Sequence, residues 1–209
     1  IGVVFTLLQL LLPFTFSQSV DGGYYHSLIL CSDSTVWATG RNNFGQLGNG
    51  TNNNSVIPVQ VTGLSQIVSV AAGGDFSLAL KADGTVWSWG LNANGQLGNN
   101  STVNSNIPVQ VQNVSNIYSF SAGENYSLAL KNDGSVWGWG KNNSGQLGDG
   151  TYTNKTTPIQ VSGICPSTGM INHTIENIFH IYPNPFSTQT ILQTDNLLKN
   201  ATLTVDNCF

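Results

Sequence analysis

The chain has 209 residues, with six Lys or Arg against ten Asp or Glu, so its formal net charge is −4 at pH 7. Only 8% of its residues are charged, against about 25% in an average globular protein. This composition argues against a nucleic-acid partner, which requires clustered Lys and Arg, and against a disordered acidic tail. The length suits one domain with appendages or two small domains.

The N-terminal segment predicts export. Residues 3–16 read VVFTLLQLLLPFTF, an uncharged run too short for the roughly 20 residues of a membrane-spanning helix. Ser17 and Gln18 follow, so residues 1–17 are interpreted as a signal peptide cleaved before Gln18, with its basic start missing because the chain begins at Ile1. A buried strand or a short membrane anchor is the alternative. We expect a secreted or outer-surface protein without a membrane span.

An internal repeat of 50 residues occupies residues 18–164. Gly-Gln-Leu-Gly occurs at 45–48, 95–98 and 145–148, and Trp37, Trp87 and Trp137 keep the same spacing. Within the second copy, 67–73, the two halves of 76–90, and 107–111 each have the pattern of a short strand. Four strands per repeat predict an all-β fold of three propeller-type blades, forming an incomplete or open propeller.

The hairpin turns of the three repeats differ in sequence. Asp83-Gly84 and Asp133-Gly134 join alternating hydrophobic runs, which is a strong hairpin signal because such turns require a positive φ. The first repeat has Ser32-Asp33-Ser34 instead and lacks the glycine. We therefore expect a different turn in the first blade.

The repeats resemble a known family. The pattern A-G-x-x-[HFY]-S-L-A-L, then D-G-x-V-W-x-W-G, then G-Q-L-G-x-G is similar to the regulator of chromosome condensation repeat. In that family the repeats build a propeller of about seven blades, within the usual range for propellers. The resemblance implies protein–protein interaction. The family's founding role, nucleotide exchange on a small GTPase with chromatin contact, fits an acidic exported chain poorly.

The C-terminal segment has a different pattern. Residues 179–209 contain Tyr182-Pro183-Asn184-Pro185-Phe186 and two alternating runs, 190–194 and 201–205, which predict the opening strands of a small β-sandwich. The segment resembles the C-terminal sorting domain of bacterial type IX secretion cargo, in truncated form. This resemblance implies the secretion machinery as a partner. Residues 165–178 are then a linker.

No catalytic residue, cofactor or metal site is predicted. His26 stands where the other repeats have Phe76 and Tyr126, which indicates packing. Ser27, Ser77 and Ser127 recur in every repeat, as expected for hydrogen-bonding core residues and not for a nucleophile. Loop 141–151 mildly resembles calcium loops but lacks their alternating carboxylates. Cys31, Cys165 and Cys208 form no disulfide framework, and one pairing stays open.

The tryptophans are predicted to pack between blades. Trp87 and Trp89, like Trp137 and Trp139, are two residues apart and therefore on one strand face. Burying one such ring stabilises the fold by roughly 4–6 kcal/mol before costs are subtracted. A sugar-stacking platform is the alternative. Thr39 takes the second position in the first repeat, so looser packing is expected there.

Loop residues that differ between the repeats are the candidates for a binding surface. A shared frame with variable loops suits recognition, although neutral drift produces the same pattern. We expect a non-enzymatic interaction module with a protein partner. The alternatives are a secreted inhibitor or enzyme accessory domain and, with least support, a polysaccharide-acting enzyme. The candidate residues are Tyr24, Arg41, Phe44, Leu91, Asn94, Glu124, Lys141 and Tyr152.

Three blades are too few for a closed ring, which takes roughly 4–8. An open set leaves apolar blade faces and strand edges unpaired. The sequence therefore predicts either assembly into a homo-oligomer, if three repeats are genuine, or a longer natural array of which near-identical repeats are missing. In either case a monomeric fragment of residues 18–164 is expected to be poorly soluble.

Overall fold

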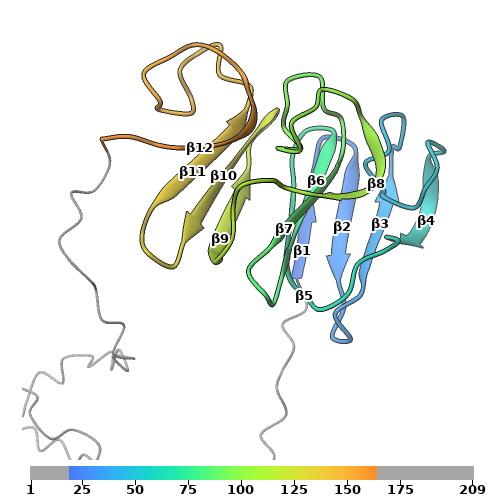
Figure 1. Ribbon diagram of the computed structural model, residues 1–209. Coiled ribbons are helices and arrows are strands. Elements are labelled where there is room, and N and C mark those ends of the chain that lie inside the picture. The colour runs from blue at the N-terminus through green and yellow to red at the C-terminus, as the bar shows by residue number, and fades with distance from the viewer. Residues whose placement is uncertain (1–18, 164–209) are drawn as a thin grey trace, which may run out of the picture. The chain divides into compact units, whose positions relative to one another are not determined.

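The computed structural model describes residues 19–163, which fold into three four-stranded antiparallel sheets (Figure 1). Each sheet is one repeat and is called blade 1, 2 or 3. The strand orders are β1-β2-β3-β4, β5-β6-β7-β8 and β9-β10-β11-β12. This confirms the all-β fold with propeller-type blades. Within 19–163 there is no helix that could cross a membrane.

The strands are short and their bounds repeat from blade to blade. Blade 1 contains β1 (Ser19–Gly22), β2 (His26–Leu30), β3 (Val36–Gly40) and β4 (Ser55–Gln60). Blade 2 contains β5 (Ile67–Ala72), β6 (Phe76–Lys81), β7 (Val86–Gly90) and β8 (Ser105–Gln110). Blade 3 contains β9 (Ile117–Ala122), β10 (Tyr126–Lys131), β11 (Val136–Gly140) and β12 (Lys155–Gln160).

Several sequence predictions lie outside the described residues. Contacts divide the chain into two units, Ile1–Met170 and Ile171–Phe209, and residues 19–163 belong to the first. The predicted signal peptide 1–17, linker 165–178 and sorting segment 179–209 therefore stay predictions. The same holds for a disulfide, because Cys31 is the one cysteine in the described part of the chain.

All three hairpin turns have one conformation, so the prediction that the first would differ is wrong. Ser34 has a φ of 64°, close to the 79° of Gly84 and the 82° of Gly134. Its N–H donates to the Cys31 carbonyl at 3.0 Å, matching the bond from Gly84 to Lys81 at 2.9 Å. Asp33 stabilises the turn because its carboxylate accepts bonds from the backbone N–H and hydroxyl of Thr35.

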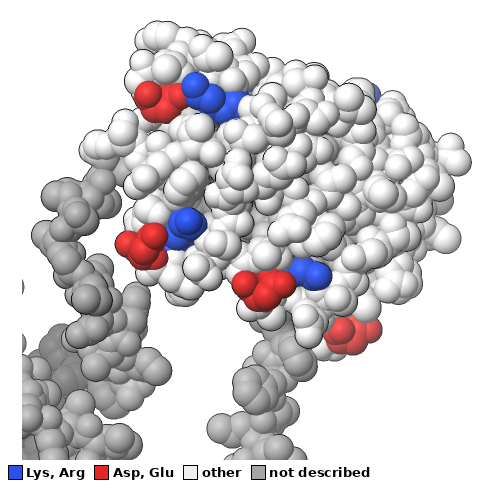
Figure 2. All heavy atoms as spheres, viewed as in Figure 1, with Lys and Arg blue, Asp and Glu red and all other residues white. Residues whose placement is uncertain are grey.

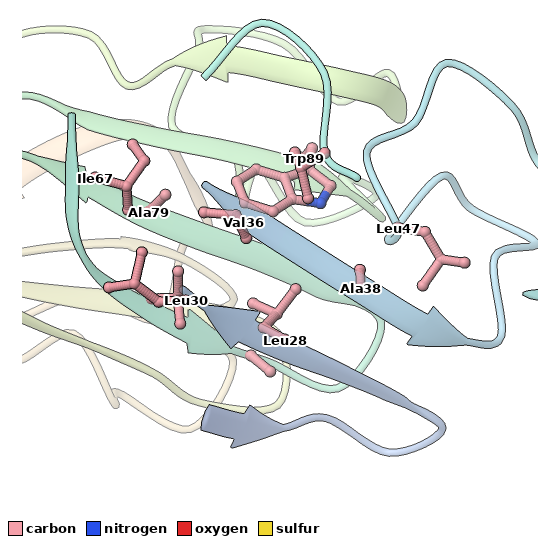
Figure 3. Packing of buried hydrophobic residues seen from close by; sticks show 11 residues of the cluster. Leu28, Leu30, Val36, Ala38, Leu47, Ile67, Ala79 and Trp89 are labelled. Carbon is pink, nitrogen blue, oxygen red and sulfur yellow. The ribbon is translucent and has the colours of Figure 1, made fainter. Parts of the chain in front are cut away.

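Successive blades pack face to face through apolar side chains. Leu28, Leu30 and Val36 of blade 1 lie against Ile67, Ala79 and Trp89 of blade 2 (Figure 3). A second cluster joins blades 2 and 3 in the same way, with Leu78, Leu80 and Val86 against Ala129 and Trp139. The face of a blade that meets the next blade is rich in leucine and is called the C-side face. The opposite face is called the N-side face, and in blades 2 and 3 it carries the buried tryptophan, Trp89 or Trp139.

A backbone carbonyl in the Gly-Gln-Leu-Gly loop bonds each blade to the next. The Gln46 carbonyl accepts from the Ser77 hydroxyl at 2.9 Å and from the Trp89 indole N–H at 2.8 Å. The Gln96 carbonyl accepts from Ser127 at 3.3 Å and Trp139 at 2.9 Å. The core role predicted for the recurring serine is thus confirmed twice.

Ser27 does not share this role, and its prediction as a core residue is wrong. It is exposed because no described blade precedes blade 1. Thr39, at the tryptophan position, is half-buried on the same face, as the expected looser packing requires. Of the tryptophans, Trp89 and Trp139 are fully buried. Trp87 and Trp137 are only half-buried, although Trp137 packs against the cluster between blades 2 and 3. Full burial between blades therefore holds for the second tryptophan of each pair.

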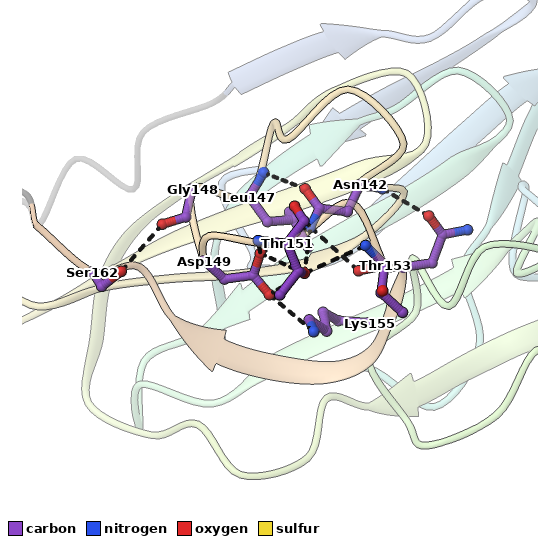
Figure 4. Close-up of polar contacts among 9 residues, drawn as sticks. Asn142, Leu147, Gly148, Asp149, Thr151, Thr153, Lys155 and Ser162 are labelled. Carbon is purple, nitrogen blue, oxygen red and sulfur yellow. Dashed lines mark hydrogen bonds and ion pairs between the residues drawn. The ribbon is translucent and has the colours of Figure 1, made fainter.

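A buried asparagine organises the long loop between the third and fourth strands of each blade. The Asn142 side chain donates to the Thr151 carbonyl at 3.0 Å, and its carbonyl oxygen accepts from the Leu147 N–H at 2.9 Å (Figure 4). Asp149 pairs with Lys155 at 2.9 Å, and this contact holds the pKa of its carboxyl well below the usual range. Lys155 and Thr151 therefore occupy the carboxylate oxygens of Asp149, which is the acidic residue of the loop that resembles calcium loops.

His26 is buried beside the Gln46 carbonyl, as its predicted packing role requires. Its Nε2 lies 3.0 Å from the Ser77 hydroxyl oxygen, and that hydroxyl donates to Gln46. Nε2 must therefore carry the proton and donate to Ser77. Burial lowers the pKa of His26 to about 4, although the carboxylates of Asp75 and Asp21 oppose this shift. The imidazole is neutral at pH 7.

Replacing Trp89 with Phe tests the bond to the Gln46 carbonyl. The variant keeps an aromatic ring between the blades but removes the indole donor and part of the packing, so we expect the free energy of unfolding to fall by about 2 kcal/mol. Urea denaturation measures this change. Trp37→Phe is the matched control, because Trp37 is half-buried and bonds to Thr35 within its own blade. Equal losses in the two variants would contradict the role of the inter-blade bond.

Replacing His26 with Phe, the residue at position 76, tests the buried imidazole. The folded pKa of about 4 lies below the ordinary 6.5, so the unfolded chain takes up the proton first as the pH falls. Stability is therefore full above pH 6.5 and decreases towards pH 4, by about 3 kcal/mol from this group. The pH dependence of unfolding between pH 7 and 4 should be steeper in the wild type than in the variant. Parallel curves would contradict the assignment.

Candidate interaction surface

The predicted binding residues all lie at one end of their blades. In an antiparallel blade, the loop between the first and second strands and the loop between the third and fourth strands emerge at the same end. Two backbone bonds connect these ends between blades. The Tyr24 N–H donates to the Gly74 carbonyl at 3.0 Å, and the Gly74 N–H donates to the Glu124 carbonyl at 3.0 Å. The loops between the first and second strands of the three blades, called the inner loops, are thereby fixed relative to one another.

Arg41 is the centre of a side-chain cluster on this end. Its guanidinium carbon lies 5.6 Å from the centre of the Tyr25 ring and 5.4 Å from that of the Phe44 ring. Its terminal nitrogen lies 3.6 Å from a carboxylate oxygen of Asp75 in blade 2. Cation–π contacts and an ion pair therefore hold the guanidinium in place while a third of the side chain stays exposed.

Asp75 is the member of the cluster that connects it to the blade interface. The carboxylate oxygen that faces Arg41 also accepts a bond from the side-chain amide of Gln46 at 2.9 Å. Gln46 in turn accepts a bond from the Phe44 N–H through its side-chain carbonyl at 3.0 Å. The aromatic and charged groups of the surface are thus fixed by a residue whose backbone joins the two blades.

Tyr24 extends the cluster towards blade 3. Its ring is 57% exposed and meets Tyr25 edge to face, with 6.4 Å between the ring centres. Partial burial and the nearby carboxylate of Glu124 raise the pKa of the Tyr24 phenol above its ordinary value. The name Arg41 cluster is used below for Tyr24, Tyr25, Arg41, Phe44, Asp75 and Glu124.

The other predicted residues do not join this cluster. Leu91 takes the place of Arg41 in blade 2, so the ion pair has no counterpart there. The side-chain oxygen of Asn94 accepts a bond from Asn154 at 3.0 Å and links blades 2 and 3. Lys141 is half-buried at the matching position of blade 3. Tyr152, in the loop between β11 and β12, is 74% exposed.

Sequence comparison missed Tyr25 and Asp75. Both occupy one position of the repeat, filled by Tyr25, Asp75 and Asn125, and this position varies as much as its neighbours do. The available signal was Arg41, the single arginine in a chain with few charges. Its partner could have been sought among the acidic residues at the same end of the next blade.

Charge is sparse on the described surface. On the face seen in Figure 2, acidic and basic side chains lie beside one another in small groups, and most of the face is uncharged. No group of three or more His, Cys, Asp or Glu able to hold a metal ion occurs within residues 19–163. Lys81 and Lys131 each lie over one tryptophan ring, whereas Arg41 contacts two aromatic rings and a carboxylate, which distinguishes the Arg41 cluster among the described residues.

The chain is similar to known proteins in sequence and in structure. The X-linked retinitis pigmentosa GTPase regulator homolog of Caenorhabditis elegans is 37% identical over 59 residues, which are 27% of this chain and 4% of that protein. Human WBSCR16 aligns with a TM-score of 0.62 and 30% identity, covering 69% of this chain and 39% of its own. Prp20p of Saccharomyces cerevisiae aligns with a TM-score of 0.64 and 23% identity, covering 70% and 38%.

The chain thus spans well under half the length of each of these relatives. Residues 33–80, 83–130 and 133–167 match the regulator of chromosome condensation (RCC1) repeat, and a second description of the same repeat matches 18–46, 67–96 and 117–146. The matches keep the period of the blades and cover more than half of the chain. This protein therefore belongs to the family of proteins built from RCC1 repeats.

Proposed function

We propose that the chain is a non-enzymatic module that binds a partner protein through the Arg41 cluster. The observation that carries this proposal is an arginine held between two aromatic rings and a carboxylate, next to a largely exposed tyrosine. Tyrosine and arginine are enriched among the residues that contribute most to protein–protein binding.

The fixed geometry of the cluster also favours binding. A side chain that is free before binding loses roughly 0.5–1.5 kcal/mol of rotamer freedom when a partner immobilises it. Arg41 and Tyr24 have already lost much of this freedom through their contacts with Asp75, Tyr25 and the inner loops. A structural neighbour uses proteins as partners, since yeast Prp20p binds Gsp1p and histones.

The proposal is tested by removing the two side chains that present the surface. The double variant Tyr24→Ala and Arg41→Ala should bind a partner captured from the surface or medium of the source cells at least about tenfold more weakly than the wild type. The measurement is quantitative affinity capture, followed by titration with the purified partner.

A matched control carries Tyr118→Ala and Lys81→Ala. Tyr118 is 67% exposed, and both residues lie at the opposite end of their blades. The control should bind as the wild type does. A partner that is lost with the control and retained by the Arg41 variant would overturn the proposed surface.

We further propose that the protein is exported and acts outside the cell or on its outer surface. The apolar run 3–16 supports this proposal, as does the resemblance of 179–209 to a type IX sorting segment, with the secretion machinery as its partner. The first described strand begins at Ser19, so cleavage before Gln18 leaves every described strand intact.

N-terminal sequencing of the protein recovered from its source cells tests this second proposal. The expected mature chain begins at Gln18 and occurs in the medium or outer-surface fraction. A chain that retains residues 1–17 and stays inside the cell would refute export, without affecting the proposed binding surface.

A further inference from the structure

Blade 1 packs on blade 2, and blade 2 packs on blade 3, through the same set of contacts. The Gly-Gln-Leu-Gly loop of one blade lies against the N-side face of the next, where the serine and the tryptophan donate to its glutamine carbonyl. The fit is close: a Cβ added to Gly45 would lie 2.4 Å from the Cα of Asn106 in the next blade. The neighbouring Gly50 N–H also donates to the Asn106 carbonyl at 2.9 Å.

In blade 1, no loop of the described residues covers the receiving face. A hollow of about 490 Å³, called the N-side groove, is lined there by Tyr25, Thr39, Arg41, Asn54, Ser55 and Val56. Val56 corresponds to Asn106 and is fully exposed, and Ile57 beside it is 66% exposed. Ser27, which corresponds to the donors Ser77 and Ser127, is exposed on the same face.

In blade 3, the matching loop meets no receiving face among residues 19–163. Its Gly-Gln-Leu-Gly sequence at 145–148 repeats the two docked loops. Among residues 19–163 no donor meets the Gln146 carbonyl, and Gln146 is half-buried where Gln46 and Gln96 are fully buried. Leu128, Leu130 and Val136, on the C-side face, are likewise less buried than their counterparts in blade 1.

We propose that a second copy of this chain docks head to tail, with its loop 144–148 in the N-side groove of the first. The occupant follows from the two interfaces already present within the chain, because the groove and the loop are the halves of that interface that no residue of 19–163 covers. Ser27 would donate to the Gln146 carbonyl of the second copy. Lys141 of that copy would meet Tyr25, because its equivalent Arg41 meets Asp75, the equivalent of Tyr25.

The contact between copies should be weaker than the contacts between blades. Thr39 offers no indole donor where Trp89 and Trp139 bond to the glutamine carbonyl. Tyr25 offers no carboxylate where Asp75 accepts from the Gln46 amide. This inference goes beyond the proposed function. The N-side groove shares Tyr25 and Arg41 with the Arg41 cluster, whereas Ser27 and Thr39 lie outside the cluster and distinguish the two proposals.

The test is sedimentation velocity of the full chain over a range of concentrations. The wild type should associate reversibly. Ser27→Glu should weaken association at least about tenfold, because it places a carboxylate against the Gln146 carbonyl in place of a donor. Ser27 is exposed in the single copy, so the variant should unfold at the wild-type temperature. Thr39→Trp should tighten association about tenfold by supplying the indole donor.

Val103→Trp is the matched control for an added aromatic ring. Val103 is 72% exposed on a loop of blade 2, away from the N-side groove. Association that is equally strong in this control and in Thr39→Trp would show nonspecific adhesion and overturn the proposal. So would a wild type that stays monomeric at every concentration, which would mean that the groove is empty or covered by the same chain. Partner capture through the Arg41 cluster is measured separately, so either proposal can fail alone.

Discussion

One backbone carbonyl in each long loop holds the array together. The Gln46 oxygen has two lone pairs, and both are used by donors of the next blade, the Ser77 hydroxyl and the Trp89 indole. Both donor side chains are fully buried, and a buried donor without a partner costs about 1–3 kcal/mol. The loop must therefore present this oxygen at one place, which explains why its four residues recur together with the serine and the tryptophan fifty residues apart.

The sequence predicted what recurs, because a recurring residue makes the same contact in each copy. The period, the strands and the burial of Trp89 and Trp139 followed from that. Ser27 shows the limit, since the same residue in the equivalent strand is exposed when no described blade lies before it. Ser34 shows another: a left-handed φ of 64° disfavours a non-glycine residue, yet the Asp33 carboxylate fixes the turn through Thr35.

The candidate surface was predictable only in part, because its contacts cross from one repeat to the next. Aligning the repeats compares Arg41 with Leu91 and Lys141, and the variation at this position made Arg41 a candidate. The partner of Arg41 is Asp75, which belongs to another blade and to another position of the repeat. Only the stacking of blade on blade brings the two positions together, and this stacking is set by the Gln46 carbonyl and the apolar faces.

The two ends of such an array differ in chemistry. A repeat that docks by one rule leaves an acceptor loop at one end and a donor face at the other, as at Gln146 and Ser27. In blade 1 the donor face has diverged, with Thr39 in place of tryptophan and Tyr25 in place of aspartate, whereas its C-side face keeps Leu28, Leu30 and Val36. In the proposed head-to-tail contact these changes would weaken docking at the N-side groove, whereas the contact with blade 2 keeps its residues. They also supply Tyr25 to the ring pair that holds Arg41, so the same divergence built part of the candidate surface.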